Sequence, residues 1–542
     1  MNLRVFLSIL FFSLLVYSCA QRGRPDGGPL DEDPPKIVTE RPPNFSNMFS
    51  EEELRIHFNE YIKLDDPRNQ IIFSPPIEPR PEIMPMGLAS KYVGIKFDLD
   101  SLQKETTYTI NFGLSIEDNN EGNKFPFYKY VFSTGSYLDS LAIEGKLFQP
   151  ENRVADEFIS VLLYEIDTAF SDSVVYKKLP TYISYTQDST NTFQLENMKA
   201  GKYKLIAISD ENNNYKFDSS QDKIGFFEDT IVLPQDDQKY FEVSVFKEIP
   251  SFKAEQRPKQ EKLNQIIFGY RGNITEKNHS IELLGEKPED FKYQILKEED
   301  ADTLNYWFKP YFEKDSLLFV FGNEKKYDTI KMFPKEIEPA DSLKITQVNK
   351  GSILYDEPMK ITANVPLAKF EKDSMSLMNV KDSVALDFTV ELNTYRNLIE
   401  VQFDKEEDEG FELKILPGGI TSFFDETNDT LVMKSSTKKY SEYGNLVLTL
   451  QNIKRYPIIV QLITSKDVVK YEQFSQNAQV FEFKHLKPDE YFIKVIYDDN
   501  NNQVWDTGNY LEKIQPEKVD YSKEPIKIRA NWDDSHVINL PN

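Results

Sequence analysis

Cysteine is almost absent from this chain, since Cys19 is the only one among 542 residues. The chain beyond position 19 can therefore form no internal disulfide, and each of its domains has to be stabilised by its own hydrophobic core. Catalysis by a cysteine nucleophile and zinc sites built on cysteine thiolates are excluded there for the same reason.

Histidine is also scarce, and the four histidines are scattered along the chain: His57, His279, His485 and His536. The spacing motifs GxSxG, HExxH, GxGxxG and the P-loop are missing. A pair of catalytic carboxylates is not excluded among 89 acidic residues, but no pattern marks one. We expect a non-enzymatic protein, and an enzyme or hydrolase accessory is the weaker hypothesis.

Positive charge is in deficit, with 64 Lys plus Arg against 89 Asp plus Glu and a formal net charge of −25. An acidic surface repels nucleic acid and anionic lipid headgroups. We therefore expect no nucleic-acid partner and no direct binding of the folded part to anionic lipid.

Apolar runs long enough to span a bilayer are missing too. The most apolar segment is MNLRVFLSILFFSLLVYS (1–18), which carries one early cation and is too short to cross a membrane. With Val16 and Ser18 before Cys19, it resembles a bacterial lipoprotein signal with its lipobox. The resemblance implies cleavage before Cys19 and lipidation of that residue, followed by a flexible Gly/Pro/charge-rich tether over 19–35. An ordinary secretory signal with an incidental cysteine is the alternative.

Aromatic residues, by contrast, are plentiful, with 29 Tyr and 39 Phe against 21 Gly. Short runs of alternating polarity recur between turn residues. In TTYTINF (106–112), Tyr108 and Ile110 face one way while Thr107 and Thr109 face the other. This period-2 pattern at regular spacing predicts an all-β protein made of β-sandwiches.

An internal repeat organises the chain. The loop DENNNYKFD (210–218) returns as DDNNNQVWD (498–506), each after similar strand-like sequence, and the segments preceding each copy also match in kind. The repeating unit is therefore predicted to be a pair of sandwiches, with one additional sandwich between the pairs. The predicted sandwiches cover residues 36–138, 139–248, 249–338, 339–440 and 441–542.

The repeated loops place oxygen-bearing side chains at positions 1, 3, 5 and 9, as in calcium-binding loops. These residues are Asp210, Asn212, Asn214, Asp218, Asp498, Asn500, Asn502 and Asp506. Neither copy has glycine at position 6 or a bidentate acid at position 12. Two interpretations stay open, a turn stabilised by Asn and Asp side chains and a weak Ca²⁺ site. No other cofactor is expected.

Asp followed by Ser or Thr and then, in nearly every case, an apolar residue is a second recurrent pattern. The hydroxyl residues are Ser101, Ser140, Thr168, Ser173, Ser189, Thr230, Thr303, Ser316, Thr329, Ser342, Ser374, Ser383 and Thr430. Turn ends followed by strand starts enrich this order in any β protein. The pattern also resembles the O-glycosylation sequon of Bacteroidota, which predicts that some of these sites carry glycans.

Further segments resemble Bacteroidota lipoproteins with an N-terminal bacterial Ig-like domain. RGRPDGGPLDEDPPKIV, IHFNEYI, IEDNNEGN and YVFSTG are similar to its tether and strands; GKYKLIAISDENNNYKFD and EYFIKVIYDDNNNQVWDTGNY are similar to prealbumin-like (carboxypeptidase regulatory-type) domains. The resemblance implies tandem Ig-like (36–138, 339–440) and prealbumin-like (139–248, 441–542) sandwiches in an elongated array. Asn214-Tyr215 and Asn502-Gln503 depart from the family's Asn-Gly.

The same resemblance implies a non-catalytic lipoprotein anchored in the outer membrane through its lipid and exposed at the cell surface. It would act as a scaffold or accessory subunit of an outer-membrane β-barrel protein or complex, the barrel-assembly machinery among them. A surface glycan-binding or adhesive protein is the alternative function.

Overall fold

The computed structural model describes residues 31–154, 156, 158–186, 191–235, 240–299, 301–339 and 341–541. Cys19, Ser189 and the predicted signal peptide lie outside the described residues. Within them, regular structure is almost all β, and helix is confined to α2 (Pro67–Gln70) and to short 3₁₀ turns. The all-β prediction is confirmed, and no described helix has the length and hydropathy needed to cross a membrane.

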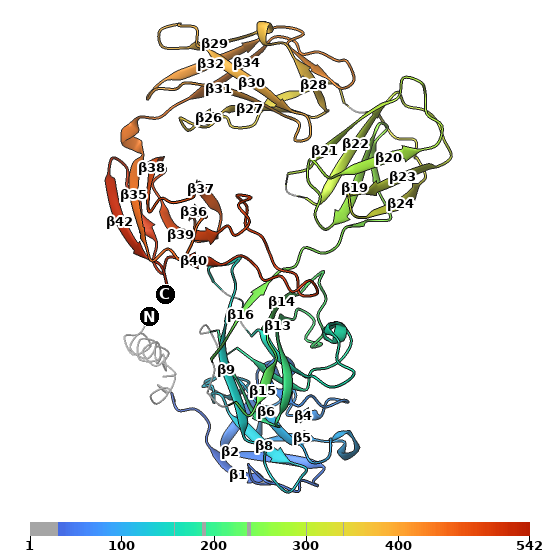
Figure 1. Cartoon of the computed structure of the whole chain (residues 1–542), viewed down its shortest axis with the longest axis vertical. Helices are drawn as coiled ribbons and strands as arrows, with labels where there is room; N and C mark the ends of the chain where they lie inside the picture. The colour runs from blue at the N-terminus through green and yellow to red at the C-terminus, as the bar shows by residue number, and fades with distance from the viewer. Residues whose placement is uncertain are drawn as a thin grey trace, which may run out of the picture.

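Sandwiches 1 and 2 are the first two of five consecutive groups of strands, each around its own core (Figure 1). Sandwich 1 holds β1 (Ile37–Arg41), β2 (Glu53–Leu64), β3 (Ile72–Ser74), β4 (Glu82–Met84), β5 (Ser90–Lys96), η1 (Leu99–Ser101), β6 (Thr107–Asn111), β7 (Ile116–Asp118) and β8 (Lys129–Ser133). Sandwich 2 holds β9 (Leu141–Phe148), β10 (Ser160–Glu165), η2 (Asp172–Tyr176), β11 (Tyr182–Tyr185), β12 (Thr192–Met198), β13 (Gly201–Ser209), β14 (Lys223–Phe226), β15 (Ile231–Leu233) and β16 (Tyr240–Phe246).

Sandwich 3 is the additional one between the two repeated pairs. It holds β17 (Lys253–Ala254), β18 (Lys259–Lys262), β19 (Gln265–Arg271), β20 (Ser280–Leu284), β21 (Lys292–Lys297), β22 (Thr303–Lys309), β23 (Leu317–Gly322) and β24 (Tyr327–Met332). Its two sheets run in the orders β17-β19-β22-β21 and β20-β23-β24.

Sandwiches 4 and 5 complete the chain. Sandwich 4 holds β25 (Ile345–Gln347), β26 (Gly351–Ser352), β27 (Met359–Ala363), β28 (Leu367–Phe370), η4 (Lys372–Ser374), β29 (Met375–Asn379), β30 (Phe388–Asn393), β31 (Leu398–Phe403), β32 (Gly410–Ile415), β33 (Ile420–Ser422) and β34 (Leu431–Ser436). Sandwich 5 holds η5 (Tyr440–Glu442), β35 (Gly444–Gln451), β36 (Ile458–Ile463), β37 (Val469–Ser475), β38 (Val480–Leu486), β39 (Glu490–Tyr497), β40 (Val519–Tyr521), β41 (Ile526–Lys527) and β42 (Asp533–Asn539).

The strand pairing of sandwich 5 repeats that of sandwich 2. In sandwich 2, β9 pairs with β12 and lies parallel to β16, while β13 pairs with β10, β14 and β15. In sandwich 5, β35 pairs with β38 and lies parallel to β42, while β39 pairs with β36, β40 and β41. Sandwich 2 adds a β14–β16 pairing that joins its two sheets into one.

Sandwich 1 packs across an outer face of sandwich 2. Tyr108 and Ile110 on β6 enter the core of sandwich 1, as the alternation predicts. Thr107 and Thr109, on the opposite face, are also buried, so that face is not open to solvent. Sandwich 2 covers it, and Asn197 Nδ2 donates to Thr109 Oγ1 at 2.8 Å.

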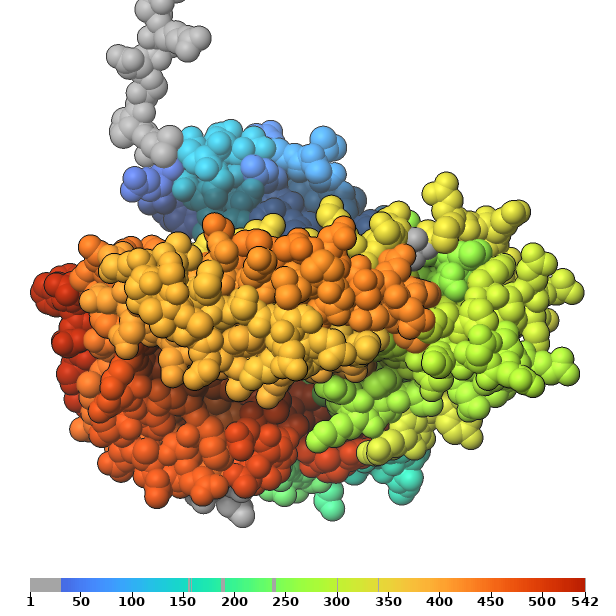
Figure 2. All heavy atoms as spheres, turned by 90° about the horizontal axis from the view of Figure 1, so that it is seen from above, coloured from blue at the N-terminus to red at the C-terminus, as the bar shows by residue number. Residues whose placement is uncertain are grey.

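The tandem β-sandwich array is thus present, and its path turns back on itself. Sandwich 3 meets sandwich 4 through a small apolar cluster that includes Trp307 and Phe423, and the two also adjoin when seen from above (Figure 2). Sandwich 5 then returns to sandwich 2, and its Tyr510 belongs to the same buried cluster as Phe226 and Phe246 of sandwich 2 and Ile72 of sandwich 1.

Candidate functional site: the acidic loops and the cleft beside the first

The two acidic loops have the same backbone conformation. Positions 4 and 6 are left-handed in both, with φ of 52° and 57° at Asn213 and Tyr215 and of 61° and 64° at Asn501 and Gln503. Glycine is the usual residue for such a backbone, and other residues adopt it at a cost of about 1–2 kcal/mol. Both loops therefore have a left-handed backbone at position 6, where an Asn-Gly sequence would place its glycine, with a tyrosine or a glutamine there instead.

An aspartate at position 1 organises each loop. Asp210 Oδ2 accepts the N–H of Tyr215 at 2.6 Å, and Asp498 Oδ2 accepts the N–H of Gln503 at 2.8 Å. Burial raises the pKa of Asp210, and the N–H of Tyr215 acts against this shift. The position-1 carboxylates thus serve as acceptors inside the turn.

A second carboxylate, which the sequence analysis missed, accepts hydrogen bonds from the backbone of each loop. Asp222 accepts the N–H groups of loop positions 2 and 9, from Glu211 at 3.1 Å and Asp218 at 2.7 Å. Glu517 does the same in the other copy, from Asp499 at 2.7 Å and Asp506 at 3.1 Å. Both acids are buried. Their different types and distances along the chain hid this equivalence from a gap-free comparison of the two loops.

The remaining predicted ligands are exposed or bonded within the loop. Asp506 Oδ2 accepts from the amides of Asn500 and Asn502 at 2.5 and 2.7 Å, while Asp218 Oδ1 accepts from Ser220. The described residues contain no group of three or more His, Cys, Asp or Glu side chains placed to hold a metal ion. The geometry is that of a side-chain-stabilised turn, and weak Ca²⁺ binding stays a prediction.

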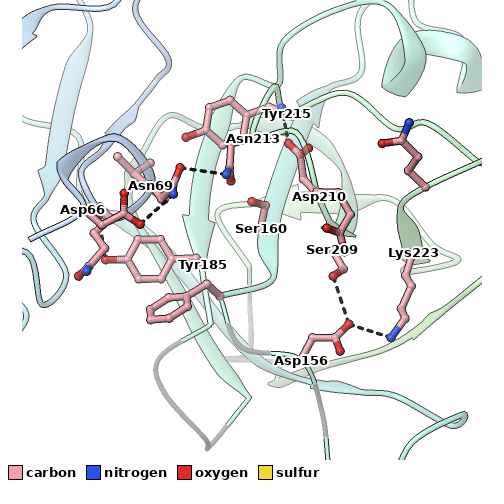
Figure 3. A pocket seen from close by; sticks show the side chains of 15 residues that line it. Asp66, Asn69, Asp156, Ser160, Tyr185, Ser209, Asp210, Asn213, Tyr215 and Lys223 are labelled. Atoms are coloured by element: carbon pink, nitrogen blue, oxygen red, sulfur yellow. Dashed lines mark hydrogen bonds and ion pairs between the residues drawn. The ribbon is translucent and has the colours of Figure 1, made fainter.

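The first loop forms one wall of a cleft of about 570 Å³ between sandwiches 1 and 2. Asn213 Nδ2 donates to Asn69 Oδ1 of sandwich 1 at 2.9 Å, and Asn69 in turn donates to Asp66. Figure 3 shows these amides on one side of the cleft, with Tyr185 nearby. Burial raises the pKa of Tyr185, so its hydroxyl stays protonated at neutral pH.

The opposite side of the cleft carries a compensated pair of charges. Asp156 accepts from Lys223 Nζ at 2.8 Å and from Ser209 Oγ at 3.2 Å (Figure 3). Burial works to raise the pKa of Asp156, but the hydrogen bond and charge of Lys223 outweigh it and leave the pKa below its usual value. Nothing in the sequence pattern pointed to this cleft, because its walls come from segments far apart in the chain.

The second loop lies in a different setting. Arg455 holds Asp499 in a two-pronged ion pair at 2.5 and 2.7 Å, and the indole of Trp505 donates to Glu517 O at 3.0 Å. In the first loop the matching aromatic, Phe217, is buried in the cluster shared by three sandwiches.

The predicted glycosylation residues that the structure describes are exposed or partly exposed. Ser101, Ser173 and Ser374 lie in 3₁₀ turns, and Thr303 begins β22. These places suit a modification and equally suit ordinary strand ends, so glycosylation stays a prediction.

Comparisons with known proteins bear on the fold. No curated protein matches the chain. Among solved structures, the Bacillus anthracis TIE protein aligns over 100% of this chain and 79% of its own, with 9% identity and a TM-score of 0.14. The S-layer protein rSbsC aligns over 87% and 65%, with 10% identity and a TM-score of 0.14.

SGBP-B of the Bacteroides ovatus mixed-linkage glucan utilization locus, solved with a mixed-linkage heptasaccharide, aligns over 72% of this chain and 92% of its own, with 11% identity and a TM-score of 0.16. Scores this low carry no argument. A family model does match part of the chain, over residues 31–134, and it describes the bacterial Ig-like domain. Sandwich 1 is thereby confirmed as Ig-like.

Proposed function

We propose that this protein is a non-enzymatic scaffold, anchored by lipid at Cys19 to the outer membrane and docked at the cell surface on an outer-membrane β-barrel complex such as the barrel-assembly machinery. The observation that supports a scaffold best is the return of sandwich 5 onto sandwich 2. It joins sandwiches 2 to 5 in a closed cycle, which restricts hinge motion between them.

Sandwich 5 supplies one side of this contact through residues 507–515. Tyr510 is fully buried, and its N–H donates to Glu248 Oε1 at 2.6 Å. Thr507 Oγ1 donates to Lys247 O at 2.7 Å, and Gln515 Nε2 donates to Phe226 O at 3.0 Å. These hydrogen bonds, which involve both backbone and side-chain atoms, fix the position of sandwich 5 relative to sandwich 2.

Sandwich 2 supplies the other side through the residues after β9. The guanidinium of Arg153 lies 3.8 Å from the ring centroid of Phe492, an arrangement that attracts a cation to an aromatic face. The hydroxyl of Tyr521 donates to Pro150 O at 2.9 Å. The contact is reciprocal, since each sandwich places a loop on the other.

The end of the proposed tether is held on sandwich 1. Asn123 Nδ2 donates to the carbonyl of Asp31 at 2.7 Å, and Lys36 forms an ion pair with Asp33 at 3.0 Å. A lipid anchor joined by a short flexible linker to a stiff body raises the effective concentration of that body near a membrane partner.

The test is isolation of the full-length lipoprotein from its native membrane in mild detergent, with a Cys19→Ala variant beside it. The proposal expects a β-barrel protein in stoichiometric amount with the wild-type chain and a large loss of that partner with Cys19→Ala. Recovery of the wild-type chain without any barrel protein would overturn the scaffold proposal.

A further inference from the structure

The cleft between sandwiches 1 and 2 has the volume of a small-molecule site. Its 570 Å³ falls in the range of pockets that enclose drug-sized ligands, which is about 300–1,000 Å³. The cleft opens between two rigid β-sandwiches, which gives it preformed walls.

The ring of Phe158 contributes exposed aromatic surface to the cleft lining. Its side chain is 46% exposed and its backbone is left-handed, with φ of 55°. Bulky residues rarely adopt this backbone, and Phe45 and Phe127 are two further phenylalanines of this chain that do. The ring meets Tyr185 edge-to-face, with centroids 6.0 Å apart and an interplanar angle of 66°. Phe158 is thus held by a buried neighbour while part of its surface faces solvent.

The polar lining suits a ligand that is rich in hydroxyl groups. Asn69, Gln70, Asn213 and Gln221 contribute amides, and the charge of Asp156 is compensated by Lys223. Amide groups both donate and accept hydrogen bonds, so they match hydroxyl groups, which do the same.

Anionic ligands and metal ions fit this lining less well. Lys223 is the one basic residue among the described residues of the cleft, and Asp66, Asp210 and Glu211 add negative charge. An anionic ligand would be repelled. A metal ion would have to displace the backbone N–H groups that Asp210 already accepts.

We propose that this cleft binds a neutral oligosaccharide, with one sugar ring packed on Phe158 and its hydroxyl groups bonded to the amides of Asn69 and Asn213. The apolar face of a sugar ring matches an exposed aromatic ring, and its hydroxyl edge matches the amides. This inference is independent of the scaffold proposal, because it concerns one cleft and requires no membrane partner.

The test is affinity electrophoresis of the full-length protein in detergent, in gels that contain an uncharged β-glucan, α-glucan, mannan or xylan, or anionic polygalacturonate. Hexasaccharides of any polymer that retards the protein are then titrated by calorimetry. We expect retardation by at least one neutral polymer, an affinity at least ten-fold weaker for Phe158→Ala, and near wild-type affinity for Phe158→Tyr, which keeps the ring.

Phe148→Ala is the matched control. Phe148 lies in the same sandwich at 40% exposure but outside the cleft, and its substitution should leave binding unchanged. The proposal is overturned if no neutral polymer retards the protein, if polygalacturonate binds more tightly than every neutral polymer, or if Phe158→Ala binds like the wild type.

Discussion

The two acidic loops have the same internal hydrogen bond from position 6 to the position-1 aspartate, and they differ in the segment that leads from each loop to its buried carboxylate. In sandwich 2, that carboxylate, Asp222, comes four residues after Asp218, and β14 begins at once. In sandwich 5, Glu517 comes eleven residues after Asp506, so this copy holds seven more residues between the two acids than the first copy does. The longer segment contains Gly508 and Tyr510, which reach sandwich 2.

The repeated motif therefore has two separate roles, formation of a stable turn and, in the second copy, contact with another domain. The Asp/Asn turn is kept in both copies because its side chains pair with its own N–H groups. The insertion after the second turn makes the contact between domains. The two copies thus share a stable turn, and the longer segment after the second turn forms the bridge to sandwich 2.

The largest expected effect comes from removing the bridge. Tyr510→Ala deletes a fully buried ring, a change that costs about 3–5 kcal/mol for large aromatic side chains in protein cores. We expect sandwich 5 to separate from sandwich 2, so that the maximum dimension in small-angle scattering increases and amides of 507–515 exchange faster.

Gly508→Ala provides an independent variant. A Cβ at residue 508 would lie 2.5 Å from Phe246 Cζ and 2.6 Å from Ile514 O, closer than packing allows. It should open the same contact, whereas Tyr327→Ala, at a tyrosine that is 70% exposed, should leave the scattering curve unchanged. An unchanged curve for both bridge variants would contradict the proposed role of the insertion.

The equivalence of the two buried carboxylates is tested by removing each. Asp222→Ala and Glu517→Ala would each leave two N–H groups without their acceptor. A fully buried N–H group costs about 1–3 kcal/mol when it loses its acceptor, and these groups are partly buried, so we expect each variant to lose at most about 6 kcal/mol. Hydrogen exchange should accelerate in 211–218 for the first variant and in 499–506 for the second. Asp229→Ala, at an exposed acid, is the control. Slow exchange retained in both loops would contradict the shared design.

Substitution by glycine at position 6 should stabilise one loop and destabilise the other. Gln503 is exposed, so Gln503→Gly relieves the left-handed backbone and should stabilise the second loop by up to about 1 kcal/mol. Tyr215 is partly buried against the three-sandwich cluster, so Tyr215→Gly also loses packing and should destabilise the first loop. Local exchange rates measure both changes, and a change of the same sign in both would contradict this reasoning.

The smallest effect concerns pH. Burial raises the pKa of Glu248 above 4.5, against the N–H of Tyr510, and the charge of Glu512 adds to the rise. The carboxyl therefore holds its proton more tightly when the bridge is closed, so closure becomes more favourable as the pH falls toward 4.5. Glu248→Gln keeps an acceptor for Tyr510 and should abolish this dependence. The protection factor of the Tyr510 amide, which is its exchange rate relative to the intrinsic rate at the same pH, measures this dependence, and a larger protection factor at higher pH would show the opposite sign.

Local patterns predicted the strands well and the relations between domains poorly. Alternation placed Tyr108 and Ile110 in the core, because a strand's own residues determine which side is apolar. It could not reveal that Thr107 and Thr109 are also buried, because that depends on sandwich 2. The repeat predicted two matching loops, but the partners of Asn213 and Tyr510 lie 144 and 262 residues away. No local pattern records such distances.

The burial of Tyr510 against Phe226 and Phe246 has a consequence for biogenesis. Sandwich 2 is complete by residue 246, yet the side chain that covers this part of its apolar surface is synthesised more than 260 residues later. During that interval the surface is open to water and to other chains, and exposed apolar surface of this kind promotes aggregation. Until the bridge closes, a folded sandwich 2 therefore carries apolar surface that other chains can contact.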